Sequence, residues 1–454
     1  MGETCDDRID LLVIGGGTAG LVAARTASSF GARPVLVERD EQPGGDCLWT
    51  GCVPSKALLE AAADGVDDRA ALARVRAATA DIAPVDSAAA LEADGVRVLR
   101  GTARFTGPRT AVVDGRPLRF AQAVIATGSR PLVPDVPGLE DPLTTDTLWD
   151  LEELPARLLV LGGGPAGCEL AQAAVRLGSA VTLVQRAERL LPRDVPDASA
   201  AVIAAIVADG IDVRLGASLD RVDGGTAVVD GEPVRCDRVL VVAGRRPNTA
   251  ALGLGAAGVA VGPRGHVRVR RTLLTTSPRV WAAGDATPLP QYTHTAGMNG
   301  AVVAANAVLG LRRTIDEDAV PHCTFTQPEV AAVGRTRPAG GDRVHRVAHD
   351  EVDRAVAARR TGGFTEVVVD GRGRVVGATV VAPRAGETIG EAALAVRTGL
   401  TVEQVTSTTH PYPTFSDGFW NACIAAYRSS LASGATARGV AALAAARRLR
   451  LRLS

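Results

Sequence analysis

The sequence contains almost no lysine. Of its 50 basic residues only Lys56 is a lysine, and all the others are arginines. The planar, permanently charged guanidinium cannot replace a compact ammonium group where a small, tunable point charge is needed. The single lysine therefore predicts a functional position at Lys56. Chance survival of one lysine in an arginine-biased composition is the alternative, and the neighbouring residues decide between the two.

Long apolar runs are also missing. No run approaches the roughly 20 residues needed to span a bilayer, and the first residues lack the basic and apolar regions of a signal peptide. Acidic and basic residues are balanced at 50 each, so no net field favours nucleic acid or an anionic membrane. We expect a cytoplasmic protein with no membrane span and no nucleic-acid partner.

Cysteine is sparse. The seven cysteines are an odd number in a chain of 454 residues, which does not indicate a secreted disulfide framework. Only Cys47 and Cys52 are closely spaced. Such a pair indicates redox chemistry or a metal site, but no second Cys or His pair close to it in the sequence completes a zinc site. We therefore expect a redox-active pair and no bound metal.

A β-α-β unit opens the chain. The apolar run 9–14 predicts a buried strand, a glycine-rich turn leads into an Ala-rich helix, and 34–37 is the next strand. Glycines let the backbone approach a pyrophosphate, the helix N-terminus points N–H groups at it, and an acid at the second strand's end can hold ribose hydroxyls. This order predicts a dinucleotide site. Its motif residues are Gly15, Gly17, Gly20 and Glu38.

The same unit recurs between strands 158–161 and 181–184, which implies a second dinucleotide. Here the second strand ends in Gln185-Arg186 instead of an acid. Losing the carboxylate removes repulsion toward a 2′-phosphate, and Arg186 can bind that phosphate. We expect NADPH in preference to NADH, with a surface role for Arg186 as the alternative. The glycines of this unit are Gly162, Gly164 and Gly167.

The motif Gly44-Gly45-Asp-Cys47-x₄-Cys52-Val-Pro-Ser-Lys56 lies between the two units. With it, residues 8 to 428 resemble the flavoprotein pyridine nucleotide-disulfide oxidoreductases. The resemblance implies FAD on the first unit, a nicotinamide nucleotide on the second, and a homodimer whose active site is shared between subunits. It also implies a hydride path from NADPH through the flavin to the Cys47–Cys52 disulfide.

The resemblance assigns roles to individual residues. Cys52 would lie near the flavin, and Cys47 would exchange with the substrate. Lys56 would pair with Glu169, because a cation near flavin N5 stabilises the reduced, anionic flavin. The implied cofactor contacts are Gly15, Gly17, Gly20, Glu38, Gly45, Lys56, Ala126, Thr127, Gly128, Gly162, Gly164, Gly167, Glu169, Arg186, Gly244 and Asp285.

The expected fold class is α/β, with two Rossmann-type domains for FAD and NAD(P) and a C-terminal α+β dimerisation domain. Proline-rich stretches mark the first crossing between domains, and alternating strands begin near Arg335. The Ala-rich, basic tail predicts a helix that is solvated or packed in a dimer, in preference to one bound at a membrane surface. The expected boundaries are 1–150 with 276–318, 151–275, 319–430, and 431–454 for the tail.

The acceptor side departs from the disulfide-reducing members, which carry His-Pro-Thr with an acid three residues after the Thr. The matching segment here is His410-Pro-Tyr412-Pro-Thr414-Phe-Ser-Asp417. Aligning Pro-Thr414 and Asp417 places Tyr412 at the catalytic His position, as in mercuric reductase-like members. Aligning His410 keeps a histidine but loses the Thr and the acid. The first register matches more positions, and tyrosine, with an ordinary pKa of about 10, is a poor base at neutral pH.

We therefore predict an FAD-dependent NAD(P)H oxidoreductase with catalytic Cys47, Cys52, Lys56 and Glu169, and Tyr412, Asp417 or His410 on the acceptor side. The expected acceptor is a soft metal ion or a quinone-like oxidant. A disulfide reductase of the dihydrolipoamide dehydrogenase or glutathione reductase type is the alternative, and a redox-sensing flavoprotein is a third. The last residues contain no cysteine pair for delivering Hg(II), which argues against mercury itself.

Overall fold

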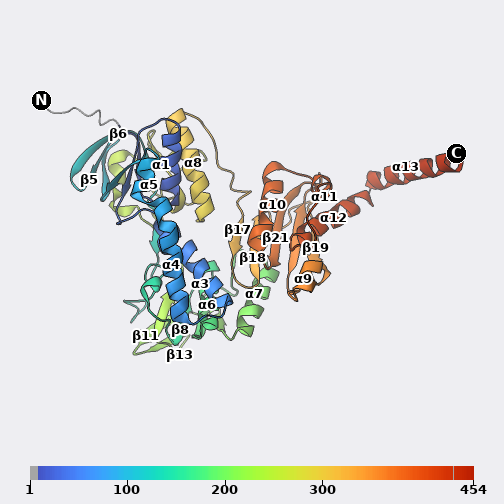
Figure 1. Cartoon of the computed structure of the whole chain (residues 1–454), viewed down its shortest axis with the longest axis horizontal. Helices are drawn as coiled ribbons and strands as arrows, with labels where there is room; N and C mark the ends of the chain where they lie inside the picture. Colours follow the sequence, from blue (N-terminus) through green and yellow to red (C-terminus); the bar gives the residue numbers. More distant parts are fainter. Residues whose placement is uncertain (1–8, 433, 454) are drawn as a thin grey trace. The chain divides into compact units, whose positions relative to one another are not determined.

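The computed structural model describes residues 9–432 and 434–453 (Figure 1). Contacts divide the chain into two compact units, Met1–Arg186 with Gly210–Glu317, and Ala187–Asp209 with Asp318–Ser454. The expected boundaries placed 187–209 in the second dinucleotide domain, whereas their contacts group them with the C-terminal residues. Two side-chain contacts hold this segment there, a hydrogen bond between Asp194 and His322 and an ion pair between Asp197 and Arg346.

The first sheet of the larger unit is a Rossmann-type sheet. Its order is β3-β2-β1-β6-β5-β4, with β16 added beside β6, so residues after 279 return to the sheet that begins the chain. Strand β1 pairs in parallel with both β2 and β6, which explains why its residues are apolar on both faces. The strands are β1 Ile9–Ile14, β2 Pro34–Glu38, β3 Arg97–Arg100, β4 Ala103–Gly107, β5 Thr110–Val113, β6 Arg116–Ile125 and β16 Val280–Ala282.

Two helices, α1 and α8, pack against each other beside this sheet (Figure 1). A Cβ on Gly300 of α8 would lie 2.4 Å from the Ala19 carbonyl oxygen of α1, so only glycine permits this approach. Helices α2 to α5 follow β2 in the chain, and α8 follows β16. The bounds are α1 Thr18–Ser29, α2 Gly45–Trp49, α3 Cys52–Ala63, α4 Asp68–Asp86, α5 Ala88–Ala93 and α8 Thr293–Leu309.

The second parallel sheet has the order β10-β9-β8-β14, and helix α6 joins β8 to β9. A Cβ on Gly167 would lie 1.7 Å from the Gly162 carbonyl oxygen, which explains the glycine there. The elements are β8 Arg157–Leu161, α6 Pro165–Arg176, β9 Ala180–Gln185, β10 Asp212–Leu215 and β14 Arg238–Val241. The antiparallel strands are β11 Leu219–Asp223, β12 Thr226–Val229 and β13 Glu232–Arg235, and a second pair is β7 Ser129–Pro131 with β15 Arg245–Pro247.

The smaller unit is built on an antiparallel sheet of order β17-β18-β21-β20-β19, with α10, α11 and α12 packed on it over a Val- and Ala-rich core. The expected fold class, with two Rossmann-type parts and a C-terminal α+β part, is confirmed. The elements are α7 Pro196–Ala208, β17 His322–Thr324, β18 Glu329–Gly334, β19 Arg343–Ala348, α9 Asp353–Ala357, β20 Phe364–Val369, β21 Val375–Ala382, α10 Ala385–Thr398, α11 Val402–Thr406, α12 Asp417–Leu431 and α13 Gly434–Leu453.

Short 3-10 helices connect these elements, and the tail expected to be helical forms α13. Among the residues described here, none of the helices combines the length and the hydropathy needed to cross a bilayer. The 3-10 helices are η1 Leu148–Asp150, η2 Ala250–Leu252, η3 Leu254–Ala257, η4 Gly284–Ala286 and η5 His349–Glu351.

A histidine is completely buried in the smaller unit. His349 is 0% exposed, and its Nε2 lies 2.9 Å from the Thr365 hydroxyl, while its Nδ1 has no hydrogen-bond partner. Gly418 leaves no free space beside the ring, because a Cβ there would lie 3.0 Å from Nε2. Burial lowers the pKa of His349 from 6.5 to about 4. The neutral imidazole is therefore the form that fits the core.

Acidification should destabilise this unit through His349. The folded pKa is lower than the unfolded one, so the stabilisation is present above pH 6.5 and is lost as the pH falls toward 4. Between pH 7 and pH 5 this group should account for about 2 kcal/mol of lost unfolding free energy. Urea denaturation of the full chain at both pH values measures it. His349→Gln should show a smaller loss over the same interval, and an equal loss would contradict the assignment.

Candidate active site

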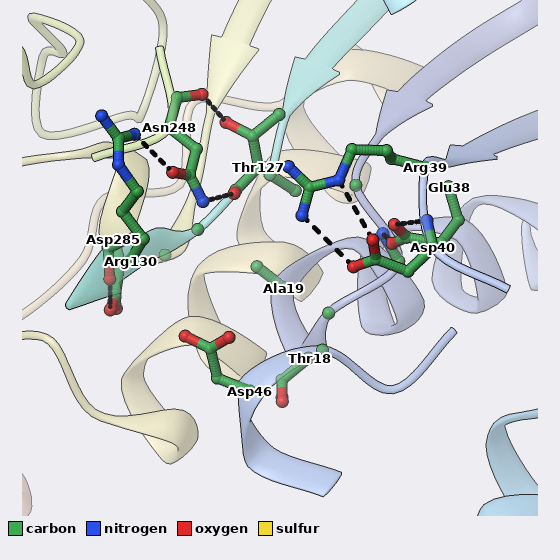
Figure 2. A pocket seen from close by; sticks show the side chains of 18 of the residues that line it. Thr18, Ala19, Glu38, Arg39, Asp40, Asp46, Thr127, Arg130, Asn248 and Asp285 are labelled. Atoms are coloured by element: carbon green, nitrogen blue, oxygen red, sulfur yellow. Dashed lines mark hydrogen bonds and ion pairs between the residues drawn. The ribbon is translucent and has the colours of Figure 1, made fainter. Parts of the chain in front are cut away.

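A cavity of about 1110 Å³ lies in the larger unit, where the glycine-rich turn after β1 faces the start of α2 and the start of α8 (Figure 2). Its volume suits an extended ligand of dinucleotide size. The structure brings ten of the predicted site residues to this one cavity. They are Gly15, Gly17, Glu38, Gly45, Cys47, Cys52, Ala126, Thr127, Gly128 and Asp285. Gly20, by contrast, acts from behind the turn, where a Cβ would lie 1.9 Å from the Gly15 carbonyl oxygen.

The turn before α1 has the donor set that a pyrophosphate needs. Helix α1 begins after Gly17, and no side chain caps it, so its first N–H groups remain available at the cavity. Glu38, at the end of β2, is held in place because its Oε2 accepts the Gly16 amide and its Oε1 accepts the Asp40 amide (Figure 2). The residues present therefore fit the adenosine diphosphate half of FAD.

A polar network lies at another wall of the cavity. Ser129 donates to Asp285 at 2.7 Å and accepts from Arg245 at 2.6 Å. Arg245 also forms a close ion pair with Asp46, the residue before Cys47. Sequence reasoning identified Asp285 but missed the other three residues. Asp46, the acid within Gly44-Gly45-Asp46-Cys47, could have indicated a partner such as Arg245, because a carboxylate beside a phosphate site needs a nearby cation.

The loop that carries the cysteine pair is held by two indoles. Trp49 donates from Nε1 to the Pro43 carbonyl oxygen, and Trp149 donates to the Thr50 carbonyl oxygen, both at 3.0 Å. Trp149 is only 8% exposed and comes from η1, about 100 residues along the chain. These bonds restrict the segment before Cys47 and the residues between Cys47 and Cys52.

Both cysteines are half-buried free thiols. The hydrogen bond from the Cys47 thiol is the largest cause that lowers the pKa of Cys52, to about 6, with help from the Thr293 hydroxyl and Lys56, while burial acts in the opposite direction. The same bond and burial raise the pKa of Cys47. At neutral pH the geometry therefore favours a thiolate at Cys52 and a thiol at Cys47.

Lys56 forms an ion pair with Glu169 across two helices. Its Nζ lies 2.7 Å from Glu169 Oε2, and the Glu169 side chain is only 4% exposed. Lys56 lies four residues after Cys52 on α3, so both face the same side of that helix. The expected proximity of Lys56 and Glu169 is present, and it places the single lysine of the sequence one helical turn from Cys52.

The second glycine-rich turn repeats the geometry of the first with one change. The Gly163 amide donates to Gln185 Oε1 at 3.3 Å, as the Gly16 amide donates to Glu38. A neutral amide thus occupies the place of the acid, and Arg186 follows it on the surface. Gly162 and Gly167 shape the turn, and α6 begins uncapped after Gly164. Gly244, expected among the cofactor contacts, does not line the large cavity.

The predicted acceptor-side residues lie in the smaller unit. Tyr412 is 72% exposed, and its hydroxyl donates to Asp353, whose carboxylate raises the pKa of the phenol. The His410 side chain is 9% exposed and lies 2.6 Å from Glu391 and 2.9 Å from the Thr408 carbonyl oxygen.

Asp417 is 6% exposed and accepts the Thr414 amide at the start of α12. It thus orders the turn that follows Tyr412. Over residues 9–432 and 434–453, no cluster of three or more His, Cys, Asp or Glu side chains could hold a metal ion.

Known proteins resemble the chain over most of its length. A mercuric reductase from Lysinibacillus sphaericus is 35% identical over 446 residues, which cover 91% of this chain and 82% of that protein. A mercuric reductase from Streptomyces lividans is 38% identical, covering 90% and 94%. A dihydrolipoyl dehydrogenase from Thermus scotoductus is 35% identical, covering 93% and 98%.

Solved structures agree with these relatives. The Cu(II) complex of the HOCl-induced flavoprotein disulfide reductase RclA from Escherichia coli has a TM-score of 0.85 at 28% identity, covering 92% of this chain and 99% of that one. The family model described as pyridine nucleotide-disulphide oxidoreductase matches residues 9–300, and the model of its dimerisation domain matches 320–423. The chain therefore belongs to the pyridine nucleotide-disulfide oxidoreductases, enzymes that use FAD and NAD(P)H.

Proposed function

We propose that the enzyme uses NADPH to reduce the Cys47–Cys52 disulfide and passes the two electrons to a soft metal ion or a quinone-like oxidant. When bound, FAD supplies the hydride acceptor between the nucleotide and the disulfide. In the first half, NADPH and a proton convert the disulfide to two thiols and release NADP⁺. In the second half, the dithiol gives two electrons and two protons to the acceptor side and becomes a disulfide again.

The environment of Tyr412 is the observation that favours a metal ion or a quinone as the acceptor. Reduction of a small disulfide releases a thiolate, and a positioned group with a pKa near the working pH speeds that step by supplying a proton. The Tyr412 phenol donates to Asp353, which raises its pKa still further above that range. A metal ion or a quinone does not release a thiolate of this kind. Tyr412 therefore fits such acceptors better than a disulfide.

His410 gives little support to the alternative of a disulfide reductase. Both of its ring nitrogens already have partners in its own unit, namely Glu391 and the Thr408 carbonyl oxygen. Its ring also lies against Trp420, with 5.4 Å between ring centroids. A general base for exchange at a sulfur would need one of those nitrogens free. We propose that Tyr412 and Asp417, together with His410, complete the site across the homodimer, and that the domains follow the boundaries expected from the sequence apart from residues 187–209, whose contacts group them with the C-terminal residues.

The acceptor is identified by following reoxidation after stopped-flow reduction with NADPH. Hg(II) or a quinone should reoxidise the enzyme rapidly, whereas lipoamide and glutathione disulfide should do so slowly. Tyr412→His should increase the rate with disulfides, and Tyr412→Phe should not. Rapid reoxidation of the unmodified enzyme by lipoamide or glutathione disulfide would establish the disulfide reductase instead. Reoxidation by oxygen alone would favour the sensor.

Arg186 should determine the preference for NADPH. Arg186→Glu removes a charge-assisted contact and adds repulsion toward the 2′-phosphate, so KM for NADPH should rise roughly tenfold or more. KM for NADH should change by less than about threefold, because NADH lacks that phosphate. Arg221→Glu makes the same change of charge at an exposed position of β11 and serves as the control. Equal effects on the two nucleotides would refute the role of Arg186.

Lys56→Arg should slow reduction by NADPH. The larger planar guanidinium cannot keep the point-charge geometry beside Glu169, and a loss of about 1.4 kcal/mol corresponds to a tenfold slower rate. Stopped-flow absorbance of the flavin measures the rate. Arg74 forms an exposed ion pair with Asp64, so Arg74→Lys tests whether replacing one basic residue by another changes the reduction rate by itself. A Lys56→Arg rate within about twofold of the unmodified enzyme would show that the single lysine has no special role.

A further inference from the structure

An acidic residue, Asp46, lies close to the turn that fits the phosphates of FAD. A Cβ on Gly45, the first residue of α2, would lie 2.6 Å from the Gly17 Cα, so the start of α2 contacts the glycine-rich turn. The Gly44 amide also donates to the Gly16 carbonyl oxygen at 2.8 Å. Asp46 follows directly, and its carboxylate is turned into the cavity (Figure 2). A phosphate held by the turn before α1 would therefore have a carboxylate close to it.

The cavity has more acidic than basic side chains. Among the described residues that line it, six have carboxylates and three have guanidinium groups, which gives a formal net charge of −3. Arg39 is already paired with Asp40, and Arg130 donates to Asn248 at 3.0 Å (Figure 2). The third cation is Arg245. Because the diphosphate of FAD is also an anion, it enters a cavity that already has an excess of negative charge.

Arg245 is shared by two of these acids. It forms a close ion pair with Asp46, and its Nε lies 3.8 Å from Asp285. Burial is the largest influence on the pKa of Asp46 and raises it, Arg245 lowers it, and Asp146 and Asp285 raise it. As a result the pKa of Asp46 is above its usual value of 3.8. The Asp46 carboxylate is thus the charge that a further anion would most readily neutralise by protonation.

We propose that Asp46 takes up one proton when FAD binds, so that the protein holds FAD more tightly at acidic than at alkaline pH. The carboxylate, one proton and FAD combine to give a complex with a neutral Asp46 carboxyl group. An O–H bond forms, and no electron is transferred. The proton removes the repulsion between Asp46 and the diphosphate, and it leaves the charge of Arg245 available to that anion. The inference does not depend on the identity of the electron acceptor.

The direction of the pH dependence follows from the two protonation states of Asp46. A bound anion raises the pKa of Asp46 above its value in the FAD-free protein. Below both pKa values the carboxyl group is neutral in either state, so the affinity does not vary with pH. Between them each unit of pH weakens binding by up to about tenfold, because binding requires one proton. Above both values the affinity is again constant and at its lowest.

The test measures the Kd of FAD for the full-length, oxidised protein between pH 5 and pH 8. In this form the disulfide has no thiol to titrate, and quenching of FAD fluorescence during a titration gives Kd. For the unmodified protein, Kd should rise by about tenfold or more over this interval. Asp46→Asn has no charge at either pH. It should bind FAD at pH 8 about as tightly as the unmodified protein does at pH 5, and its Kd should change by less than about twofold.

Matched controls separate Asp46 from its neighbours. Asp146 is an exposed carboxylate that lines the same cavity, so Asp146→Asn removes an equal charge and should keep the rise of Kd with pH. His266 is a titratable group that acts on Asp285, and His266→Gln should also keep the rise. Arg39 is the other cation that interacts with Asp46, and it stays charged over the whole interval.

Calorimetry provides a second measurement. FAD binding in buffers of different ionisation enthalpy counts the protons taken up, and the count should approach one for the unmodified protein and zero for Asp46→Asn. A Kd that stays within about twofold from pH 5 to pH 8 would overturn the proposal. A rise that persists in Asp46→Asn would assign the proton to another group. Weaker binding of Asp46→Asn at every pH would show that Asp46 acts as an anion that holds Arg245. No acceptor is added, so a wrong acceptor leaves these results unchanged.

Discussion

The ion pair between Lys56 and Glu169 is the interaction on which the geometry of the site depends. Glu169 is 4% exposed, and a buried carboxylate left without a cation would cost about 3–5 kcal/mol. The pair joins α3, which begins at Cys52, to α6, which begins at the second glycine-rich turn. One charge contact therefore fixes the sulfur and the start of the nucleotide-binding helix to each other.

Local patterns explain why much of this architecture can be predicted from the sequence. Gly15 and Gly167 stand where a Cβ would collide with backbone, and such positions produce the same motif in any chain. The Cys47-x₄-Cys52 spacing and the single lysine also lie within ten residues of one another. Short-range chemistry of this kind is visible in the sequence, because the residues that interact are close along the chain or belong to a fixed turn.

The contacts missed by sequence reasoning are long-range ones. Arg245 reaches Asp46 across 199 residues, and Thr293 reaches Cys52 across 241. No pattern of neighbouring residues predicts either contact. Each depends on how β15 or α8 packs against the segment that contains the cysteine pair. The same reason explains residues 187–209, which lie between two strands of the second sheet in sequence but form side-chain contacts with the C-terminal residues of the smaller unit.

The paired turns have a consequence for how one chain sorts two cofactors that share an adenosine diphosphate group. The Gly16 and Gly163 amides make the same hydrogen bond, one to the carboxylate of Glu38 and the other to the amide of Gln185. A carboxylate repels the extra phosphate of NADPH, whereas an amide tolerates it. The duplicated turns thus present the same backbone donors with different local selectivity, because an added 2′-phosphate is disfavoured beside the carboxylate of Glu38 and tolerated beside the amide of Gln185.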